Sequence, residues 1–222
     1  PANNMTYEQA ACMPVAVQTM HNALVGAGRL KKGETVLIQG ASSGVGLLGM
    51  QIAKHMGASI VMGTSTNEGR RNRLKEFGCD LALDTNDPKW PEKVKEATGG
   101  KGADLIINLV GGTQFAECMR CVARHGRIAV VGYVDGSMKA EIDLSEVHAG
   151  RIEIFGISNA RLTDAEKADV TRNFVRDVMP AIADGRIKPV IDRVFAFDEL
   201  PAAKAHMEAS GMVGKIVVKM QD

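Results

Sequence analysis

The sequence predicts an α/β fold of the Rossmann type, in which a doubly wound six-stranded parallel sheet is followed by a C-terminal helix–strand appendage. Three observations lead to this prediction. Six β-favouring runs alternate with helices or long connections, a glycine-rich turn at residues 40–46 joins the first run to a helix, and the alternation ends near residue 160. With 222 residues, the chain is long enough for one large domain and a smaller unit. We therefore expect a lead-in helix in residues 1–25, a nucleotide-binding domain in residues 26–160 and an appendage in residues 161–222.

The elements of the expected sheet follow in chain order. The capping-box pair Thr6 and Gln9 starts a helix predicted over residues 6–25. Strands are predicted at residues 35–39, 59–63, 81–83, 104–110, 127–131 and 151–157, because each is a short β-favouring run. Helices are predicted at residues 44–56, 67–77, 91–98 and 114–124, and a polar stretch is expected between the last two strands.

The residues after 160 follow a different pattern. A long helix is predicted over residues 163–184, with an interruption near Pro180. Residues 198–210 are predicted as a helix with Asp198 as N-cap and Pro201 in the first turn, and residues 189–197 and 215–219 as extended segments. This part is too short to hold a separate core, so we expect it to pack against the sheet or against something absent from this chain.

Composition and charge narrow the range of functions. A formal net charge of +1 provides no global field that would attract nucleic acid or an anionic membrane. The sequence has no run of 18 apolar residues and no signal peptide, which favours a cytoplasmic protein with free thiols. Cys118 and Cys121 form a C-x-x-C pair within a helical pattern, and further zinc ligands are not near in sequence. We therefore predict buried thiols there and no metal site.

The glycine-rich turn predicts phosphate binding. Its spacing, Gly40-x-x-x-Gly44-x-Gly46, departs from the commonest dinucleotide form, but it leaves a buried strand and opens a helix. Glycines let the backbone come close to a phosphate, and Gly46 lets the helix pack closely on the strand. Amides at the helix N-terminus and the helix dipole would then bind a pyrophosphate, with Ser42 and Ser43 as hydroxyl donors. A strand–helix turn without a ligand is the alternative interpretation.

The end of the second strand favours NADP over NAD. An NAD site usually has Asp or Glu there to accept hydrogen bonds from the ribose, whereas this chain has Thr64-Ser65-Thr66. Arg70, Arg71 and Arg73 follow, and guanidinium groups would hold a 2′-phosphate that a carboxylate would repel. Alternatively, these arginines form a solvated helix face, and at least one of the three is expected to do so.

An ordered set of segments now resembles a known family. The segments are Glu8-Gln9-Ala10-Ala11, Pro14-Val15, Thr19, Ala23-Leu24, residues 32–38, residues 40–46, Gln51-Ile52-Ala53-Lys54, residues 98–104, Gly126-Arg127-Ile128 and Gly214-Lys215-Ile216-Val217. Together they resemble the nucleotide-binding part of the medium-chain dehydrogenase/reductase superfamily, in particular its zinc-free quinone oxidoreductase branch. The resemblance covers nearly the whole chain.

The resemblance implies a set of NADP(H) contacts. Ser65 stands where NAD users of the family carry an acid, and Arg70 matches a basic residue that quinone reductases direct at the 2′-phosphate. The nicotinamide half is implied to lie beyond the fourth and fifth strands, and Thr19 to approach it from the first helix. The implied cofactor-binding residues are Thr19, Ser43, Gly44, Val45, Gly46, Ser65, Arg70, Thr85, Val110, Gly111, Gly132 and Tyr133.

No catalytic residue is predicted in the chain. None of the histidines has a Cys, Ser or acidic partner at a sequence spacing typical of a metal or triad site, so all are expected at surface or helix-end positions. They are His21, His55, His125, His148 and His206. In the family, a GroES-like catalytic domain precedes this region. Because the sequence begins at Pro1, directly before the first helix, the resemblance implies a form without that domain, which binds cofactor but turns over poorly.

The function that the resemblance implies is zinc-independent, NADPH-dependent hydride transfer to a quinone or an α,β-unsaturated carbonyl compound. Two alternatives remain open: the cofactor domain of a zinc-dependent alcohol dehydrogenase, and a non-catalytic nucleotide-binding module. Residues 151–157 would form an edge of the sheet, and in the family this edge often pairs with its twin. Because exposed edges need cover, we expect a homodimer through this strand. The substrate is expected to be a small molecule whose identity the sequence leaves open.

Overall fold

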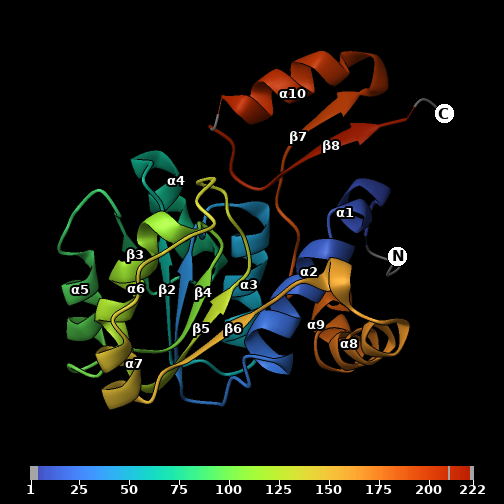
Figure 1. Ribbon diagram of the computed structural model, residues 1–222. Coiled ribbons are helices and arrows are strands. Elements are labelled where there is room, and N and C mark those ends of the chain that lie inside the picture. Colours follow the sequence, from blue (N-terminus) through green and yellow to red (C-terminus); the bar gives the residue numbers. More distant parts are fainter. Residues whose placement is uncertain (1–4, 210, 221–222) are drawn as a thin grey trace.

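A computed structural model describes residues 5–209 and 211–220 and confirms the doubly wound sheet. Six parallel strands lie in the order β3-β2-β1-β4-β5-β6, so the order reverses between β1 and β4 (Figure 1). Val36 in β1 pairs with Val61 in β2 and with Leu105 in β4. The strands are β1 Thr35–Gln39, β2 Ile60–Thr64, β3 Leu81–Leu83, β4 Ala103–Asn108, β5 Val122–Val130 and β6 Glu153–Gly156.

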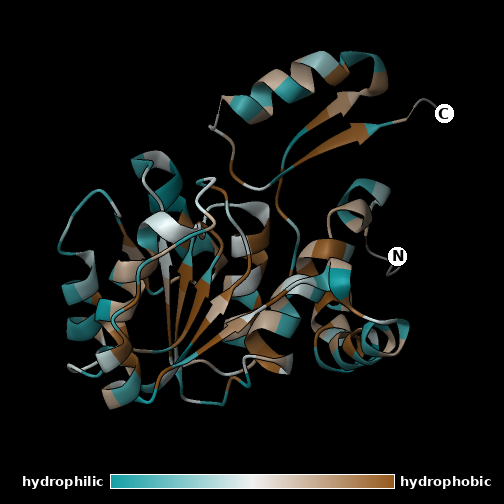
Figure 2. Ribbon diagram, viewed as in Figure 1, coloured by the Kyte–Doolittle hydropathy of each residue, from teal (hydrophilic) through white to brown (hydrophobic). Residues whose placement is uncertain are grey.

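Helices cover both faces of this sheet, as parallel strands require. Successive side chains of β1 point to opposite faces: Val36 and Ile38 enter one core, and Leu37 enters the other with Trp90 and Phe115. Figure 2 shows the hydrophobic strands between helices whose outer surfaces are hydrophilic. The helices of this domain are α3 Gly44–His55, α4 Glu68–Arg73 with a 3-10 turn at Leu74–Phe77, α5 Trp90–Ala97, α6 Phe115–Cys121 and α7 Leu144–Gly150.

The N-terminal segment forms two helices instead of the single helix predicted over residues 6–25. α1 spans Tyr7–Ala11 and begins with the expected capping box of Thr6 and Gln9. α2 spans Pro14–His21 and continues as a π-helical turn at Asn22–Gly26. The helix breaks before Pro14 because proline has no amide hydrogen to donate to the preceding turn.

The connections around β5 also differ from the prediction. α6 ends at Cys121, and Val122 already pairs with Ala103 at the start of β5. The register between β4 and β5 then shifts, and His125 has a positive φ of 62°, so residues 122–126 form an irregular extended segment. The expected polar stretch before β6 contains α7, which begins at the N-cap Asp143. The strand β6 is an edge of the sheet, as predicted.

The C-terminal residues form two parts that attach to the domain differently. α8 (Asp164–Asp177) and α9 (Met179–Ala183) are separated before Pro180, as predicted, and Val178 and Ile182 join the core beside α2 and α3. β7 (Ile191–Ala196), α10 (Leu200–Glu208) and β8 (Lys215–Lys219) form a second unit that stands beyond the carboxyl ends of the strands (Figure 1).

This β7–β8–α10 unit contains a parallel strand pair and one helix. The N-cap of α10 is Glu199 and not the predicted Asp198, because a 3-10 turn at Phe197–Glu199 precedes the helix. Pro201 lies in the first turn, as predicted, whereas Ser210, the predicted last residue, lies outside the described residues. Among the helices of the described ranges, none is long and apolar enough to cross a membrane.

Candidate functional site

The glycine-rich turn lies at the carboxyl end of β1, where the strand order reverses. Gly40 has a positive φ of 72°, which favours glycine, and its amide donates to Thr64 Oγ1 at 3.1 Å. Ser43 is the N-cap of α3: its Oγ accepts from the Gly46 amide at 3.1 Å and donates to the Gly40 carbonyl at 2.9 Å. The conformation of the turn is therefore held by two hydrogen bonds within it and by one to Thr64 in β2. The amides of Gly44 and Val45 belong to the first helical turn, which has no carbonyl partners within the helix.

Gly46 is required for the close approach of α3 to this turn. A Cβ at Gly46 would lie 2.7 Å from Ala41 Cα and 2.7 Å from the Ala41 carbonyl oxygen. Both are backbone atoms, so no side-chain rotation could relieve the clash. The predicted close packing of α3 on the strand–helix turn is therefore present at Gly46, on the side of the turn that faces Ala41.

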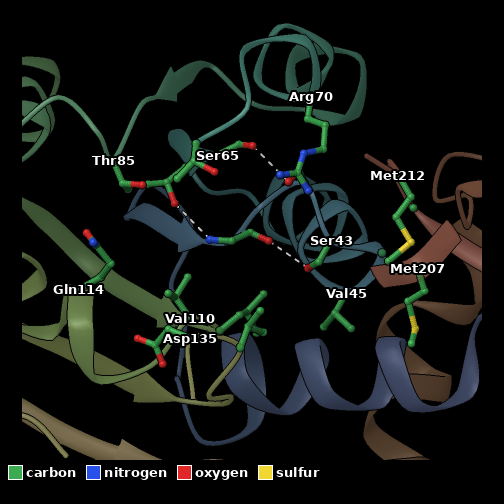
Figure 3. Close-up of a pocket in the computed structure, with 18 of the residues that line it drawn as sticks. Ser43, Val45, Ser65, Arg70, Thr85, Val110, Gln114, Asp135, Met207 and Met212 are labelled. Atoms are coloured by element: carbon green, nitrogen blue, oxygen red, sulfur yellow. Dashed lines mark hydrogen bonds between the residues drawn. The ribbon is translucent and has the colours of Figure 1, made fainter. Parts of the chain in front are cut away.

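A cavity of about 820 Å³ adjoins the turn. It lies between the carboxyl ends of β1, β2 and β4 and the β7–β8–α10 unit, and it has the size of a small-molecule or cofactor site. Figure 3 shows side chains entering it from these separate elements. The predicted cofactor-binding residues that line the cavity are Ser43, Gly44, Val45, Ser65, Arg70, Thr85 and Val110.

Two of the three arginines after β2 are already engaged. Arg71 Nη1 donates to the Ser65 carbonyl at 3.0 Å and lies 3.1 Å from an Asp84 carboxylate oxygen. Arg73 is exposed and pairs with Glu76 at 3.5 Å. Arg73 thus forms the solvated helix face that the sequence allowed for, and Arg71 braces the loop after β2.

Arg70 is different, because it lines the cavity and has no side-chain partner among the described residues. Its Nε is buried and makes no hydrogen bond, and no carboxylate of the described residues forms an ion pair with it. Figure 3 shows its side chain extending from α4 toward Ser65 and the turn at Ser43. The Ser65 hydroxyl is buried next to it and donates to Ser42 Oγ at 3.2 Å. A buried guanidinium nitrogen without an acceptor, beside two hydroxyl groups, is suited to an anionic ligand.

The other end of the cavity is organised by Asp135, in the loop after β5. Its carboxylate accepts hydrogen bonds from Thr113 Oγ1 at 2.5 Å, the Thr113 amide at 2.9 Å and the Ser137 amide at 2.8 Å. The Thr113 hydroxyl, together with these amides, holds the pKa of Asp135 below its usual range. Gly111 has a φ of 129°, and a Cβ there would lie 2.0 Å from Asp135 Oδ1. Asp135 thereby ties the loop after β5 to the loop after β4.

The remaining predicted residues do not reach the cavity wall. Thr19 Oγ1 accepts a hydrogen bond from Asn159 Nδ2 at 2.9 Å, which ties α2 to the segment after β6. Gly111 and Gly132 lie in the loops behind the wall, and Tyr133 is 49% exposed. Contacts of Thr19, Gly46, Gly111, Gly132 and Tyr133 with a cofactor therefore stay predictions.

The β7–β8–α10 unit and the turn after α10 supply wall residues that sequence reasoning did not assign to the site. Met207, Met212, Gly214, Lys215 and Ile216 line the side of the cavity opposite β4. The segment from Gly214 to Val217 belongs to the family resemblance, which is a signal for three of these residues, Gly214, Lys215 and Ile216. Met207 and Met212 have no such signal, because only the tertiary fold brings them to Val45 (Figure 3).

The expectation of surface or helix-end positions holds for His21 only in the second sense, because His21 ends α2 but is not at the surface. His21 is buried, and its Nε2 lies 3.0 Å from Asp177 Oδ2. Burial lowers the pKa of His21, and this outweighs the opposing effect of Asp177. His55 Nε2 contacts the Asp177 carbonyl at 2.9 Å, and His206 Nε2 contacts Asp192 at 2.7 Å. These partners are distant in sequence, so spacing could not reveal them, and none of the three histidines or their partners lines the cavity.

The cysteines occupy core positions, as predicted. Cys118 and Cys121 are fully buried, and burial raises the pKa of Cys118 to about 12. Cys79 is buried as well, and burial raises its pKa to about 11. Within the described ranges, no group of three or more His, Cys, Asp or Glu side chains could hold a metal ion.

Comparison with known proteins relates the chain to dehydrogenases and reductases. The family model described as zinc-binding dehydrogenase matches residues 44–175. The chain is 31% identical over 220 residues to a highly reducing polyketide synthase of Cordyceps militaris, a match that covers 98% of this chain and 9% of that protein. The chain therefore spans less than a tenth of the length of this curated relative.

Solved structures share the fold of this chain over nearly its whole length. An NAD-dependent alcohol dehydrogenase is 28% identical, with a TM-score of 0.85 over 99% of this chain and 61% of its own. A quinone oxidoreductase of Thermus thermophilus, also solved with NADPH, is 24% identical, with a TM-score of 0.86 over 98% of this chain and 68% of its own. At that identity, the second likeness concerns the fold alone.

Proposed function

Since the chain belongs to the zinc-binding dehydrogenase family, within the medium-chain dehydrogenase/reductase superfamily, we propose that its cavity binds NADPH for hydride transfer to an α,β-unsaturated carbonyl compound or a quinone. The observation that carries the choice of NADPH is Arg70, a cavity-lining guanidinium whose buried Nε has no hydrogen-bond partner in residues 5–209 and 211–220. A 2′-phosphate is the part of NADPH that NADH lacks, and it would supply the missing acceptor.

The residues present fit a dinucleotide phosphate along the length of the cavity. Arg70 and Ser65 would hold the 2′-phosphate, with Thr85 beside them on the adenosine side. The amides of Gly44 and Val45 would receive the pyrophosphate at the positive end of α3. No carboxylate stands at the end of β2 to repel the 2′-phosphate, and the nearby Asp84 is neutralised by Arg71.

The loops after β4 and β5 line the remaining part of the cavity. Val110 and Val134 make this part apolar, while Thr113 and Asp135 fix its shape through their hydrogen bonds. An apolar, shaped wall of this kind would orient a flat ring and exclude water from it. NADPH, when bound, would supply the hydride, and the chain's own contribution is binding and orientation. The polyketide synthase relative is described as highly reducing, which supports a reductive direction.

A second candidate is the cofactor domain of an alcohol dehydrogenase that uses NAD. The likeness to the NAD-dependent alcohol dehydrogenase favours it. Ser65 and Arg70 argue against it. An acid at the end of β2 would strengthen NAD binding through the ribose hydroxyls, and this chain has Ser65 there. NAD also lacks the 2′-phosphate that Arg70 would bind.

The reaction is tested with NADPH that carries deuterium at C4 of the nicotinamide. The chain is incubated for many hours with this cofactor and either a small enone or a small quinone, and the products are analysed by mass spectrometry, which detects slow turnover. We expect deuterium in the reduced product, above a control without protein. Reduction of NAD by a primary alcohol, together with no reduction of the enone or the quinone, would instead support the alcohol dehydrogenase.

A further inference from the structure

Gln114 lies at the cavity on a backbone that is held on both sides. It is the last residue of a 3-10 turn after β4 and the N-cap of α6. The amide of the residue before it, Thr113, donates to an Asp135 carboxylate oxygen at 2.9 Å. The residue after it, Phe115, is buried in the core. The side chain of Gln114 therefore starts from a fixed position on the cavity wall.

The side-chain amide of Gln114 has no role in holding the fold. It makes no cap hydrogen bond to α6, although Gln114 occupies the N-cap position. Its Oε1 is buried and has no hydrogen-bond partner in residues 5–209 and 211–220. A carbonyl oxygen that is removed from water without gaining a donor costs free energy, and a ligand that brings a donor recovers it.

Other glutamines of the described chain have this acceptor satisfied. Gln39 Oε1 accepts from Thr64 Oγ1 at 2.8 Å, and Gln51 Oε1 accepts from the Lys188 amide at 2.9 Å. Among the buried side-chain atoms without a partner in the described ranges, two belong to residues that line the cavity, namely Arg70 Nε and Gln114 Oε1. The cavity thus has an unused donor at Arg70 and an unused acceptor at Gln114, so it suits a ligand with an anion at one point and an N–H donor at another.

Gln114 lies on the adenosine side of the cavity. Figure 3 shows it on the same side as Thr85, away from Met207 and Met212. In the proposed site, Arg70 holds the 2′-phosphate with Thr85 beside it. The base is joined to the ribose at the carbon next to the one that carries this phosphate. The N–H donor nearest to Gln114 would therefore come from the adenine base.

We propose that Gln114 determines which base the cofactor carries, because its Oε1 accepts a hydrogen bond from the 6-amino group of adenine and its Nε2 donates to a neighbouring ring nitrogen. The inference rests on the proposed function, because it takes the cavity to be a dinucleotide site. A glutamine amide presents one acceptor and two donor hydrogens, which matches the amino group and ring nitrogen at an edge of adenine. A purine with an oxygen at position 6 presents an acceptor where adenine presents a donor.

Removal of the amide is the first test. Calorimetric titration of the full chain is expected to show that Gln114→Met weakens adenosine 2′-monophosphate and NADPH about tenfold, as expected for loss of hydrogen bonds to a buried acceptor. Reduced nicotinamide mononucleotide, which has no adenine, should keep its affinity within about twofold. Gln114→Leu provides a second neutral variant if the methionine variant does not fold.

Base selectivity is the second test, and a merely structural role would not change it. The probe is the deamino analogue of NADPH, in which hypoxanthine replaces adenine and the rest of the cofactor is the same. The ratio of its dissociation constant to that of NADPH should lie within about twofold of one in Gln114→Met. The ratio should be higher in the wild type and highest in Gln114→Glu, because a carboxylate only accepts and cannot turn a donor toward the oxygen at position 6.

Gln18→Met is the matched control, because Gln18 is also half-buried and lies on α2 outside the cavity. It should leave the affinities and the ratio at their wild-type values. The same ratio in the wild type, Gln114→Met and Gln114→Glu would overturn the assignment of Gln114 and leave the dinucleotide site standing. A loss in Gln114→Met that affects reduced nicotinamide mononucleotide and spares adenosine 2′-monophosphate would also overturn it. Failure of the wild type to bind NADPH at millimolar concentration would overturn both proposals.

Discussion

Replacing Arg70 by methionine should separate NADPH from NADH. Methionine keeps an unbranched stem of similar reach while removing the guanidinium, so the helix α4 should remain intact. Arg70 has no partner among the described residues, and its removal therefore leaves no protein carboxylate unpaired. The expected effect is confined to a ligand that carries the 2′-phosphate.

The magnitude follows from the hydrogen bonds that Arg70 could make. A hydrogen bond between charged groups contributes about 1.5–3 kcal/mol, and Arg70 is only half-buried, so one such bond is a fair measure of the net loss. We expect NADPH affinity to fall about 10- to 100-fold and NADH affinity to change by less than about twofold. The measurement is a fluorescence titration of each reduced cofactor into wild type and variant.

Arg73→Met is the control for this experiment, because Arg73 carries the same charge on the same helix, is exposed and pairs with Glu76. It should leave both affinities close to those of the wild type. An equal loss of NADPH and NADH in Arg70→Met would refute the assignment of Arg70 to the 2′-phosphate. So would an unchanged NADPH affinity in a variant that melts at the wild-type temperature.

Four further predictions concern stability, reactivity and assembly. Alanine is normally favoured over glycine in a helix, but Gly46→Ala should destabilise the protein by about 1–3 kcal/mol because its Cβ meets backbone; a higher melting temperature would contradict this. Burial lowers the pKa of His21, so the unfolded chain binds a proton that the folded chain resists, and the free energy of unfolding should fall as the pH drops below about 6.5. His21→Gln should flatten that part of the pH profile in urea denaturation, and an unchanged slope would count against this explanation. Cys118 should react with thiol reagents only after denaturation, given its burial and its pKa of about 12, so rapid labelling of the folded protein would show the site to be open. We propose a homodimer through the free edge of β6 (Glu153–Gly156), which sedimentation would detect, and a monomer at high concentration would exclude it.

The sheet could be predicted because its signals are local. Each strand is a short β-favouring run, and the glycine spacing at residues 40–46 predicts the first strand–helix junction. The end of α6 was predicted wrongly because it depends on tertiary pairing. Cys121 ends α6 because Val122 pairs with Ala103, a partner that helical periodicity cannot reveal. α7 was missed because its polar sequence gives little periodicity, although Asp143 is an N-cap signal.

The site was predictable where it is built from the strand–helix junctions after β1 and β2. Ser43, Ser65 and Arg70 follow strand ends, and parallel strands bring such residues to one edge of the sheet. The opposite wall comes from the β7–β8–α10 unit, whose position depends on contacts between segments far apart in sequence. Met212 and Lys215 therefore entered the site only with the three-dimensional structure.

The central claim is that the cavity beside the glycine-rich turn is an NADPH site. The most direct test is calorimetric titration of the wild-type chain with NADPH and with NADH under identical salt and pH. We predict that both bind, since the glycine turn receives the part that they share, and that NADPH binds at least about tenfold more tightly because of its extra phosphate. Equal affinities or tighter binding of NADH would contradict the preference for NADPH, and binding of neither would contradict the dinucleotide site itself.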